Sequence, residues 1–474
     1  MLKRDELSWI LQTALSSGGD FSELFWEDRR DTNIRCMERT IGGITSLHIH
    51  GAGIHVLKGT RGVYVHTNDT TLGGLTRLAQ VAADLLSSTA ASPLSDIQFS
   101  PHKYPTPTPV EIWPHTVDSR RKIQVLKEMD KAAREAGGIR GAGEVQGACG
   151  AGGVRNLNLV YFDSNQHILV ANSESLLTED DRVRTRVRMD ATVEVGAESL
   201  FEFNDFVGPC GFELFEGDYE AFARGQIASM IARLKAEPAE SCVVPVVIEG
   251  GDGGVLWHEA CGHPLEAENI AVGYGEFAGR LGQKVASEKV TLVDDGGLPG
   301  MYGSEAVDDE GHPTRKNVLI ENGVLKSYLC GRKGARLLGM ESTGSGRRQS
   351  YCFAPTSRMH NTYLAAGEDD EDEMISSIGE GLYVKELGGG DSGVEFSIEV
   401  KEAYWIRNGS IAHQVRGITL SGNSMEMIKR VDRVGRILVP EKGSFCGASS
   451  GLVPTTAFQP RIRISEMAVG GTKR

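Results

Sequence analysis

The 474-residue sequence contains no run of about eighteen apolar residues, the length that a membrane-spanning helix needs. It also lacks the unbroken apolar stretch of a secretory signal peptide. Asp5 and Glu6 follow the early basic residues, and the apolar positions from Leu7 to Leu15 recur at helical spacing. The eight cysteines are scattered and include no CxxC pair, which indicates reduced thiols in a chain of this length. We therefore expect a soluble protein located in the cytoplasm.

An excess of basic charge is missing as well. Lys and Arg number 50 against 64 Asp and Glu, which gives a formal net charge of −14 and a sequence pI near 5.4. Such a chain repels phosphate backbones and anionic lipids unless it carries a local basic patch. The pairs Arg120–Arg121 and Arg347–Arg348 are too short to form one. We expect neither nucleic acid nor a membrane among the partners.

The composition that is present is typical of a globular protein, with 40% hydrophobic and 24% charged residues. A chain of this length exceeds one ordinary core, so two or three domains are expected. Helices are predicted from Lys3 to Gly18 and over 71–87, with short strands between 21 and 68. Residues 88–117 are rich in Ser, Thr and Pro, which is typical of a linker or an extended crossing segment. Residues 1–117 are thus predicted to form an N-terminal α/β domain.

Residues 118–237 are predicted to form a middle α/β region. The first helix of this region should begin at Asp118 as N-cap and end at Gly137. The expected elements are one helix, two strands and a second helix, at 118–136, 157–172, 181–195 and 217–235. The glycine-rich segment 137–153 completes no GxGxxG pattern and is followed by no Lys-Ser or Lys-Thr. We therefore do not interpret it as a phosphate-binding loop.

Residues 238–474 are predicted to form a β-rich, largely antiparallel domain. Asn-Gly pairs at 322–323 and 408–409 separate alternating apolar runs. Such a pair is the strongest short-range signal for a β-hairpin. The chain is therefore assigned to the α+β class, with an N-terminal α/β region of helices on a sheet followed by the β-rich domain.

The segment GGDGGVLWHEACGHPLEAEN contains His258, Glu259 and His263 in an HExxxH pattern. Two imidazoles suit zinc, and a carboxylate beside the first can take a proton from water at the metal. The histidines of a zincin HExxH motif lie four residues apart, on one face of a helix. Here they are five apart and would point about 140° apart on a regular α-helix. Both reach one ion only if the helix widens, as in a π-bulge, with Gly262 giving backbone freedom and Pro264 the stop.

A tetrahedral zinc site also needs a third protein ligand, which leaves one position for water. Cys261 lies three residues after His258, and Glu266 lies three residues after His263. Cys446 lies far along the chain, in a loop rich in glycine and serine. Local spacing does not choose among these three candidates.

Two other groups of residues resemble metal sites more weakly. His48 and His50 alternate on an expected strand near His55, so a second metal is conceivable, but we interpret all three as surface residues. The acidic run at 368–373 could hold a hard cation, but it is more typical of a solvated helix start, where acids complement the helix dipole.

The segment HEACGHPLEAE resembles the signature of the TldD/PmbA family of metallopeptidases. The likeness extends to 290–329, 343–364 and the tail 446–472. In the first half it includes 16–29 and 51–69. The resemblance therefore covers nearly the whole chain.

This resemblance implies that His258 and His263 are metal ligands, that Glu259 is the catalytic base, and that Cys446 is the third ligand, since metal-bearing members close the site with a C-terminal cysteine. With the imidazole pair that suits zinc, the expected cofactor is Zn²⁺. The implied substrates are unfolded or flexible peptides, including small antitoxins and precursors of peptide antibiotics. An extended peptide could dock by adding a strand to an exposed sheet edge. The resemblance also implies a dimer that encloses a cavity, either a homodimer or a heterodimer with a PmbA-like homologue.

Two alternatives to an active peptidase follow from the same resemblance. Some family members lack the motif and serve as inert partners, and older family names suggest a modulator of DNA gyrase. The intact motif and Cys446 disfavour the first alternative. The acidic charge and the missing basic face disfavour direct contact with DNA.

The sequence departs from the family pattern at three places. The tail reads CGASSGLVPTT where CGKxGQ is common. His55 stands where an arginine is often found, and His360 stands where a small hydroxyl residue is more usual. These changes leave the metal ligands in place and concern substrate preference. Like His413, His360 could stabilise an oxyanion, but we interpret both as ordinary hydrogen-bonded polar residues.

Overall fold

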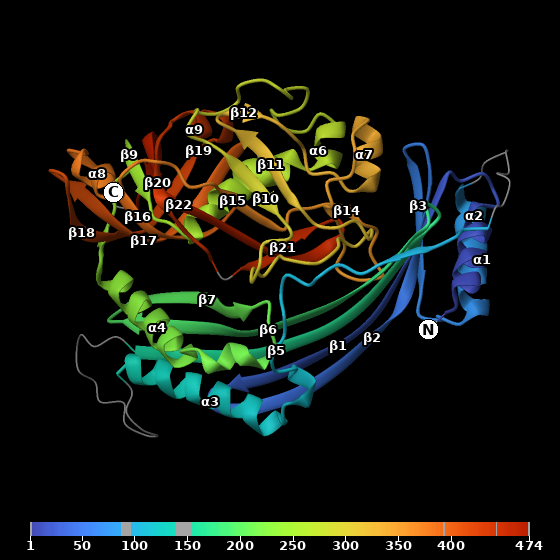
Figure 1. Ribbon diagram of the computed structural model, residues 1–474. Helices are drawn as coiled ribbons and strands as arrows, with labels where there is room; N and C mark the ends of the chain where they lie inside the picture. The colour runs from blue at the N-terminus through green and yellow to red at the C-terminus, as the bar shows by residue number, and fades with distance from the viewer. Residues whose placement is uncertain (1, 87–95, 139–152, 392–393, 442, 473–474) are drawn as a thin grey trace.

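The computed structural model describes residues 2–86, 96–138, 153–391, 394–441 and 443–472. Two large sheets organise the chain (Figure 1). One sheet of seven strands belongs to the N-terminal half, and one of thirteen strands belongs to the C-terminal half. The glycine-rich segment discussed above lies, for residues 139–152, outside the described part of the chain.

The N-terminal sheet is built mainly from long antiparallel strands that curve beneath the C-terminal half (Figure 1). Its strand order is β3-β2-β1-β5-β6, and both β4 and β7 pair with β6. The strands are β1 Phe21–Met37, β2 Thr40–Lys58, β3 Arg61–Thr67, β4 Ser100–His102, β5 Gly153–Asn172, β6 Leu176–Val195 and β7 Glu198–Gly208.

The prediction of short strands between 21 and 68 was wrong, because β1 and β2 pair continuously with a single irregularity at Arg35/Cys36. The turn between them consists of Glu38 and Arg39, both with positive φ. Asn and Gly are the residues that favour this conformation, so the sequence carries no sign of the turn. The Glu38 carboxylate accepts hydrogen bonds from the Leu157 amide and the Arg134 guanidinium, and these bonds hold Glu38 in the turn.

Four helices lie on the N-terminal sheet, as predicted, and build two separate cores at its two ends (Figure 1). The pair at one end is α1 Arg4–Leu15 and α2 Leu72–Leu86, and the pair at the other end is α3 Ser119–Ala136 and α4 Tyr219–Lys235. The predicted N-cap of α3 is confirmed, since the Asp118 carboxylate accepts the Arg120 amide. No helix in the described ranges is long and apolar enough to cross a membrane.

The C-terminal half is β-rich and mostly antiparallel, as predicted, and has one large apolar core with two smaller apolar clusters. Both Asn-Gly hairpins are confirmed, with positive φ at Asn322, Gly323, Asn408 and Gly409. Its sheet contains β8 Glu237–Pro238, β9 Cys242–Ile248, β10 Leu292–Asp295, β11 Lys316–Glu321, β12 Val324–Leu325, β15 Asn361–Leu364, β16 Glu380–Asp391, β17 Glu395–Arg407, β18 Ser410–Arg416, β19 Ile418–Asn423, β20 Val431–Val439, β21 Ser444–Ala448 and β22 Gly451–Gly470.

Short elements complete this half. They are the two-stranded ribbon β13 Gly346–Arg347 and β14 Thr356–Ser357, with the helices α5 Val255–Trp257, α6 Ala267–Ala271, α7 Arg332–Leu338, α8 Glu371–Ser376 and α9 Ser424–Lys429. The acidic run at 368–373 contains the start of α8, where the Asp370 carboxylate accepts two backbone amides. The interpretation of this run as a helix start is thus confirmed.

Buried ion pairs join the two halves. Arg182 on β6 donates to Asp309 at 2.6 Å, and Arg184 donates to Glu305 at 2.9 Å. Arg348 donates to Glu23 on β1 at 2.7 Å, with both side chains fully buried. Because a buried charge without its partner is costly, these pairs fix how the halves sit against each other. Strands of the expected first and second domains share one sheet, and the division into 1–117, 118–237 and 238–474 stays a prediction.

Candidate metal centre

The HExxxH segment forms a helix that changes its winding at the motif. After α5 comes a π-helical turn, His258–Gly262, in which the His263 amide donates to the His258 carbonyl. This bond spans five residues instead of four, so the turn is wider than an α-helical turn. The two imidazole rings therefore come together, with centroids 4.9 Å apart. The predicted distortion of the helix is confirmed.

Gly262 serves a different purpose from the one expected. Its φ of −58° and ψ of −58° are ordinary for a helix, so backbone freedom is not required. A Cβ at this position would lie 1.9 Å from Sδ of Met359. The π-helical turn therefore packs against Met359 at a distance that only glycine permits. Pro264 lies in the short 3₁₀ turn His263–Leu265 that ends the helix, as predicted.

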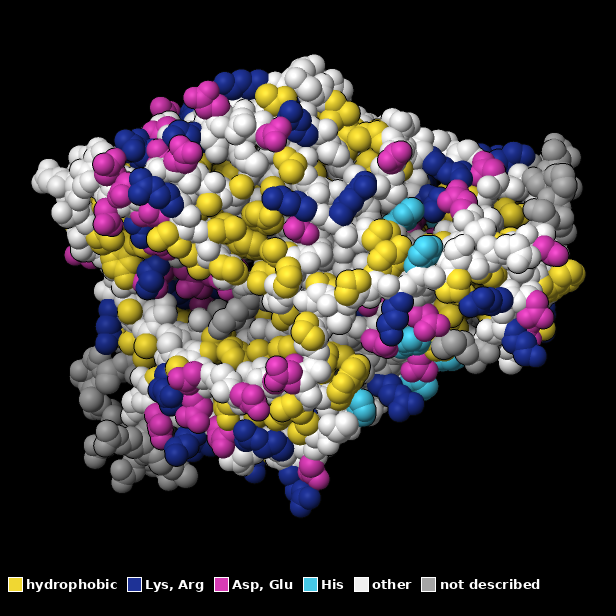
Figure 2. All heavy atoms as spheres, viewed as in Figure 1, with side chains coloured by type: hydrophobic (Ala, Val, Ile, Leu, Met, Phe, Trp, Pro, Cys, Tyr) yellow, Lys and Arg dark blue, Asp and Glu magenta, His cyan; other side chains and the backbone are white. Residues whose placement is uncertain are grey.

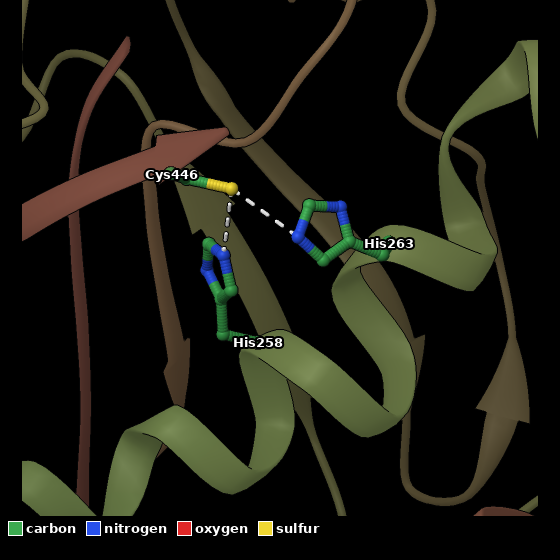
Figure 3. A group of neighbouring side chains, drawn as sticks. All are labelled: His258, His263 and Cys446. Carbon is green, nitrogen blue, oxygen red and sulfur yellow. Dashed lines mark hydrogen bonds between the residues drawn. The ribbon is translucent and has the colours of Figure 1, made fainter. Parts of the chain in front are cut away.

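Cys446 reaches both imidazoles from β21 (Figure 3). Its Sγ lies 3.2 Å from Nε2 of His258 and 3.2 Å from Nε2 of His263. All three donor atoms lie within 4.8 Å of one another. Cys446 and His258 are buried, and His263 is partly exposed.

The other two candidates for a third ligand lie elsewhere. Cys261 packs in the apolar core of the C-terminal half, where burial raises the pKa of its thiol to about 12. Glu266 accepts a hydrogen bond from Nδ1 of His263 at 3.1 Å, on the side of the ring away from Cys446. A carboxylate in this position fixes the ring and its tautomer instead of binding the metal.

The charges of the site favour a thiolate. Burial opposes ionisation of Cys446, but hydrogen bonds to both imidazoles and their charge lower the pKa of the thiol to about 4. Burial also disfavours a charged His263, yet its hydrogen bonds to Cys446 and Glu266 raise its pKa to about 10. The thiolate is the form of cysteine that binds metals.

The three side chains fit a zinc ion in both chemistry and spacing. Two imidazole nitrogens and one thiolate sulfur are zinc ligands, and three protein ligands leave a fourth position open. Bond lengths of about 2.0 and 2.3 Å in a tetrahedron place N and S about 3.5 Å apart, close to the 3.2 Å observed. Nδ1 of His258 has no hydrogen-bond partner within the described structure.

Arg358 positions both sides of the site, a role that no sequence signal indicated. Its buried guanidinium donates to the Cys446 carbonyl at 2.7 Å and to the Ser450 hydroxyl at 3.0 Å. Its Nε lies 3.6 Å from Glu266. One side chain thus ties the strand that carries the thiolate to the carboxylate that orients His263.

Glu259 lies beside these three residues in one cleft of about 730 Å³ between the two halves of the chain. Figure 2 shows the molecule hollowed between its upper and lower parts. The cleft is lined by β7 and α4 from the N-terminal half and by β16, β17 and β21 from the C-terminal half. Phe201 and Phe203 on β7 line it with 61% and 52% of their surface exposed. An extended chain therefore has room and apolar contacts next to the candidate metal ligands.

The remaining histidines considered above lie outside this cleft. His55 is buried, so its interpretation as a surface residue was wrong; burial first, and then the charge of Arg348, lower its pKa to about 3. His360 is buried near Asp294 and Glu305. His413 is exposed on β18.

Models of one known protein family match nearly the whole chain. The model described as the PmbA/TldA metallopeptidase C-terminal domain matches residues 241–471. Models for the central domain and for domain 1 match residues 113–235 and 22–86. The chain belongs to the PmbA/TldA metallopeptidase family. It is a metallopeptidase at the level of this family, as the resemblance to TldD/PmbA proteins implied.

Curated relatives carry matching names. A Haemophilus influenzae protein named metalloprotease TldD homolog is 30% identical over 474 residues, covering 96% of this chain and 93% of that protein. A Saccharolobus solfataricus protein named zinc metalloprotease TldD homolog is 29% identical over 248 residues, covering 51% of this chain and 55% of that protein.

Solved structures share the fold. A candidate modulator of a DNA gyrase from Thermotoga maritima aligns with a TM-score of 0.75 at 20% identity, covering 98% of this chain and 99% of that chain. TldE from Thermococcus kodakarensis aligns with a TM-score of 0.72 at 19% identity, covering 98% and 100%. At these identities the likeness concerns the fold alone.

Proposed function

We propose that this chain is a zinc-dependent peptidase in which His258, His263 and Cys446 hold the metal and Glu259 is the catalytic base. The observation that carries the proposal is the convergence of two imidazoles and one thiolate within 4.8 Å, beside Glu259 in an open cleft. The name of the Saccharolobus solfataricus relative supports zinc as the metal.

A bound zinc ion would supply Lewis acidity, which lowers the pKa of a water molecule toward neutrality and stabilises charge on the substrate carbonyl oxygen. Glu259 accepts the proton that this water loses. The water oxygen forms a bond to the carbonyl carbon, and the peptide C–N bond breaks. Glu259 then passes its proton to the leaving amine nitrogen, so that the products are a carboxylic acid, which keeps the second hydrogen of the water, and an amine.

The proposed substrates are unfolded or extended peptides. Within the described sheet β7 pairs with β6 alone, so its other edge is available to an added strand. Such pairing reads backbone amides and carbonyls and tolerates varied side chains. Phe201 and Phe203 belong to the same strand, and their exposed rings offer apolar contact.

The proposed assembly is a homodimer or a heterodimer with a PmbA-like homologue. The TldE structure that shares this fold makes a TldD/TldE-type pair a specific candidate. We also propose a cytoplasmic location. The alternative roles, a non-catalytic subunit or a modulator of DNA gyrase, are not favoured, because Glu259 and the three candidate ligands are all present.

The direct test of the mechanism is Glu259→Gln. We expect the variant to retain native zinc content while its kcat on an unfolded peptide falls roughly 10²–10⁴-fold, since proton transfer by a positioned side chain contributes about that much. Glu399→Gln is the matched control, because Glu399 lines the same cleft. It should cleave at close to the native rate. Native activity in Glu259→Gln, or activity in zinc-free protein, would overturn the proposal.

A further inference from the structure

A second group of His and Asp side chains that could hold a metal ion lies on the N-terminal sheet, away from the cleft. His48 and His50 are two residues apart on β2, so they point to the same face of the sheet. Asp28 on β1 pairs directly with His50 in the strand register, which puts its carboxylate on that face too. None of the three lines the cleft described above.

The donor atoms of these three residues converge. Oδ2 of Asp28 lies 3.1 Å from Nε2 of His48 and 3.3 Å from Nδ1 of His50. One ligand atom from each residue lies within 4.8 Å of the other two. This spacing is nearly that of the buried centre, where both nitrogen-to-sulfur distances are 3.2 Å.

Neighbouring residues hold the His50 ring in place. The hydroxyl of Thr70 hydrogen-bonds to Nε2 of His50 at 2.8 Å, so Nδ1 is the nitrogen that faces Asp28. The Trp26 ring meets the His50 ring edge-on, with centroids 5.4 Å apart. Nδ1 of His50 is shielded from solvent and has no hydrogen-bond partner within the described structure. A ring held by an outer hydrogen bond, with its other nitrogen free, is the arrangement of a metal-ligating histidine.

We propose that Asp28, His48 and His50 form a second metal site for a borderline divalent ion of the zinc type. Two imidazole nitrogens favour zinc, cobalt, nickel or copper over calcium and magnesium, which prefer oxygen ligands. Between 31% and 53% of each side chain is exposed, so water can complete the coordination. A bound ion would clip β1 to β2 and, through Thr70, to the segment that leads into α2.

The two sites can be told apart with Co²⁺ as the probe. Only the buried centre has a sulfur donor, so only that centre gives thiolate-to-cobalt charge-transfer absorption. Native protein should bind two equivalents of Co²⁺, and the same number of Zn²⁺ ions. Cys446→Ser should lose the charge-transfer absorption but keep the second, sulfur-free equivalent. The second site can thus be present even if the proposed catalytic centre is wrong.

Asp28→Asn and His50→Gln should each lower the affinity of the second, sulfur-free site for Co²⁺ by roughly 100-fold or more. Thr70→Val should lower it by roughly 10-fold, because outer hydrogen bonds alone contribute about 10–100-fold to metal affinity. His413→Gln is the matched control, since His413 is 53% exposed, as is His48, and lies 3.9 Å from a single carboxylate. It should bind two equivalents. Thermal melting of each metal-free variant is the control that checks whether the fold is retained. Loss of the sulfur-free equivalent in Cys446→Ser together with its absence in native protein, or an undiminished sulfur-free equivalent in Asp28→Asn, would overturn the proposal.

Discussion

At the scale of single residues, the sulfur of Cys446 lies 3.2 Å from an imidazole nitrogen of both His258 and His263. These hydrogen bonds gather the three side chains, and they lower the pKa of the Cys446 thiol to about 4 although burial opposes its ionisation. A zinc ion would take the place of the protons shared between the sulfur and the two imidazole nitrogens. This arrangement limits the reorganisation that binding requires.

Glu266 provides a test of how strongly an outer residue controls the proposed metal. It holds Nδ1 of His263 at 3.1 Å, so Nε2 faces the site. We expect Glu266→Ala to weaken zinc binding roughly 10–100-fold, since loss of such a partner has this effect in other metal sites. Competition with a chelator of known affinity measures the change. Glu266→Gln retains an acceptor oxygen and should recover most of the affinity. Native affinity in Glu266→Ala would show that the carboxylate has no part in orienting the ring.

The residues of the site could be predicted from the sequence only where they lie close together along the chain. His258, Glu259 and His263 stand within six positions and form a recognisable pattern. Cys446 could not be chosen over Cys261 and Glu266 from spacing, and the resemblance to a family pointed to it. Arg358 was missed, because its contacts to Cys446 and Ser450 span 88 and 92 positions. Such pairs are made by the fold, and no local rule predicts them.

At the scale of elements, the π-helical turn is the feature on which the site depends. A regular helix would separate two residues five apart by about 140°. The turn from His258 to Gly262 removes this separation and packs against Met359. The shape of the motif is thus maintained by packing at Gly262 as well as by the backbone hydrogen bond.

Gly262→Ala tests this packing. The added methyl group would lie 1.9 Å from Sδ of Met359, so the turn must shift. We expect a loss of about 1–3 kcal/mol in the free energy of unfolding, the usual effect of overpacking a core, together with weaker zinc binding. Denaturant unfolding and zinc titration measure the two effects.

Met359→Ala provides the control for that experiment. Alone it should destabilise the fold by about 2–5 kcal/mol through the cavity it leaves, yet keep native zinc affinity. Combined with Gly262→Ala it makes room for the new methyl group and should restore zinc binding. Unchanged stability and affinity in Gly262→Ala would contradict the packing argument.

Sequence patterns predicted where the elements lie more accurately than they predicted how long the elements are. The Asn-Gly hairpins and the N-cap of α3 were predicted correctly, because each depends on one or two residues. The length of β1 and β2 was not, because their turn uses Glu38 and Arg39 in a conformation unusual for both. β7, which lines the cleft, was missed altogether.

At the scale of the whole molecule, the two halves meet across buried charges. Glu310 belongs to this region and lies in the interior with Asp308 and Glu23 nearby. Burial first, and then these two carboxylates, raise the pKa of Glu310 from 4.5 to about 8. The folded chain therefore keeps a proton that the unfolded chain loses.

This difference predicts how stability depends on pH. The unfolded Glu310 ionises near its ordinary pKa, whereas the folded one ionises near pH 8. As pH rises between these values, the unfolded state alone releases the proton, so this group lowers the stability of the fold across that window. Glu310→Gln removes the titration. We expect its melting temperature to fall less than that of the native chain between about pH 5 and pH 8. A parallel fall in both proteins would contradict the raised pKa.

The central claim is that two imidazoles and one distant thiolate hold a single zinc ion between the two halves of the molecule. X-ray absorption at the zinc edge tests it most directly. The sample is Asp28→Asn protein, in which the second proposed site is disabled, loaded with one equivalent of zinc. We predict one sulfur neighbour at about 2.3 Å and nitrogen or oxygen neighbours at about 2.0–2.1 Å, with the sulfur lost in Cys446→Ser. A spectrum without sulfur, or one that Cys446→Ser leaves unchanged, would contradict the claim.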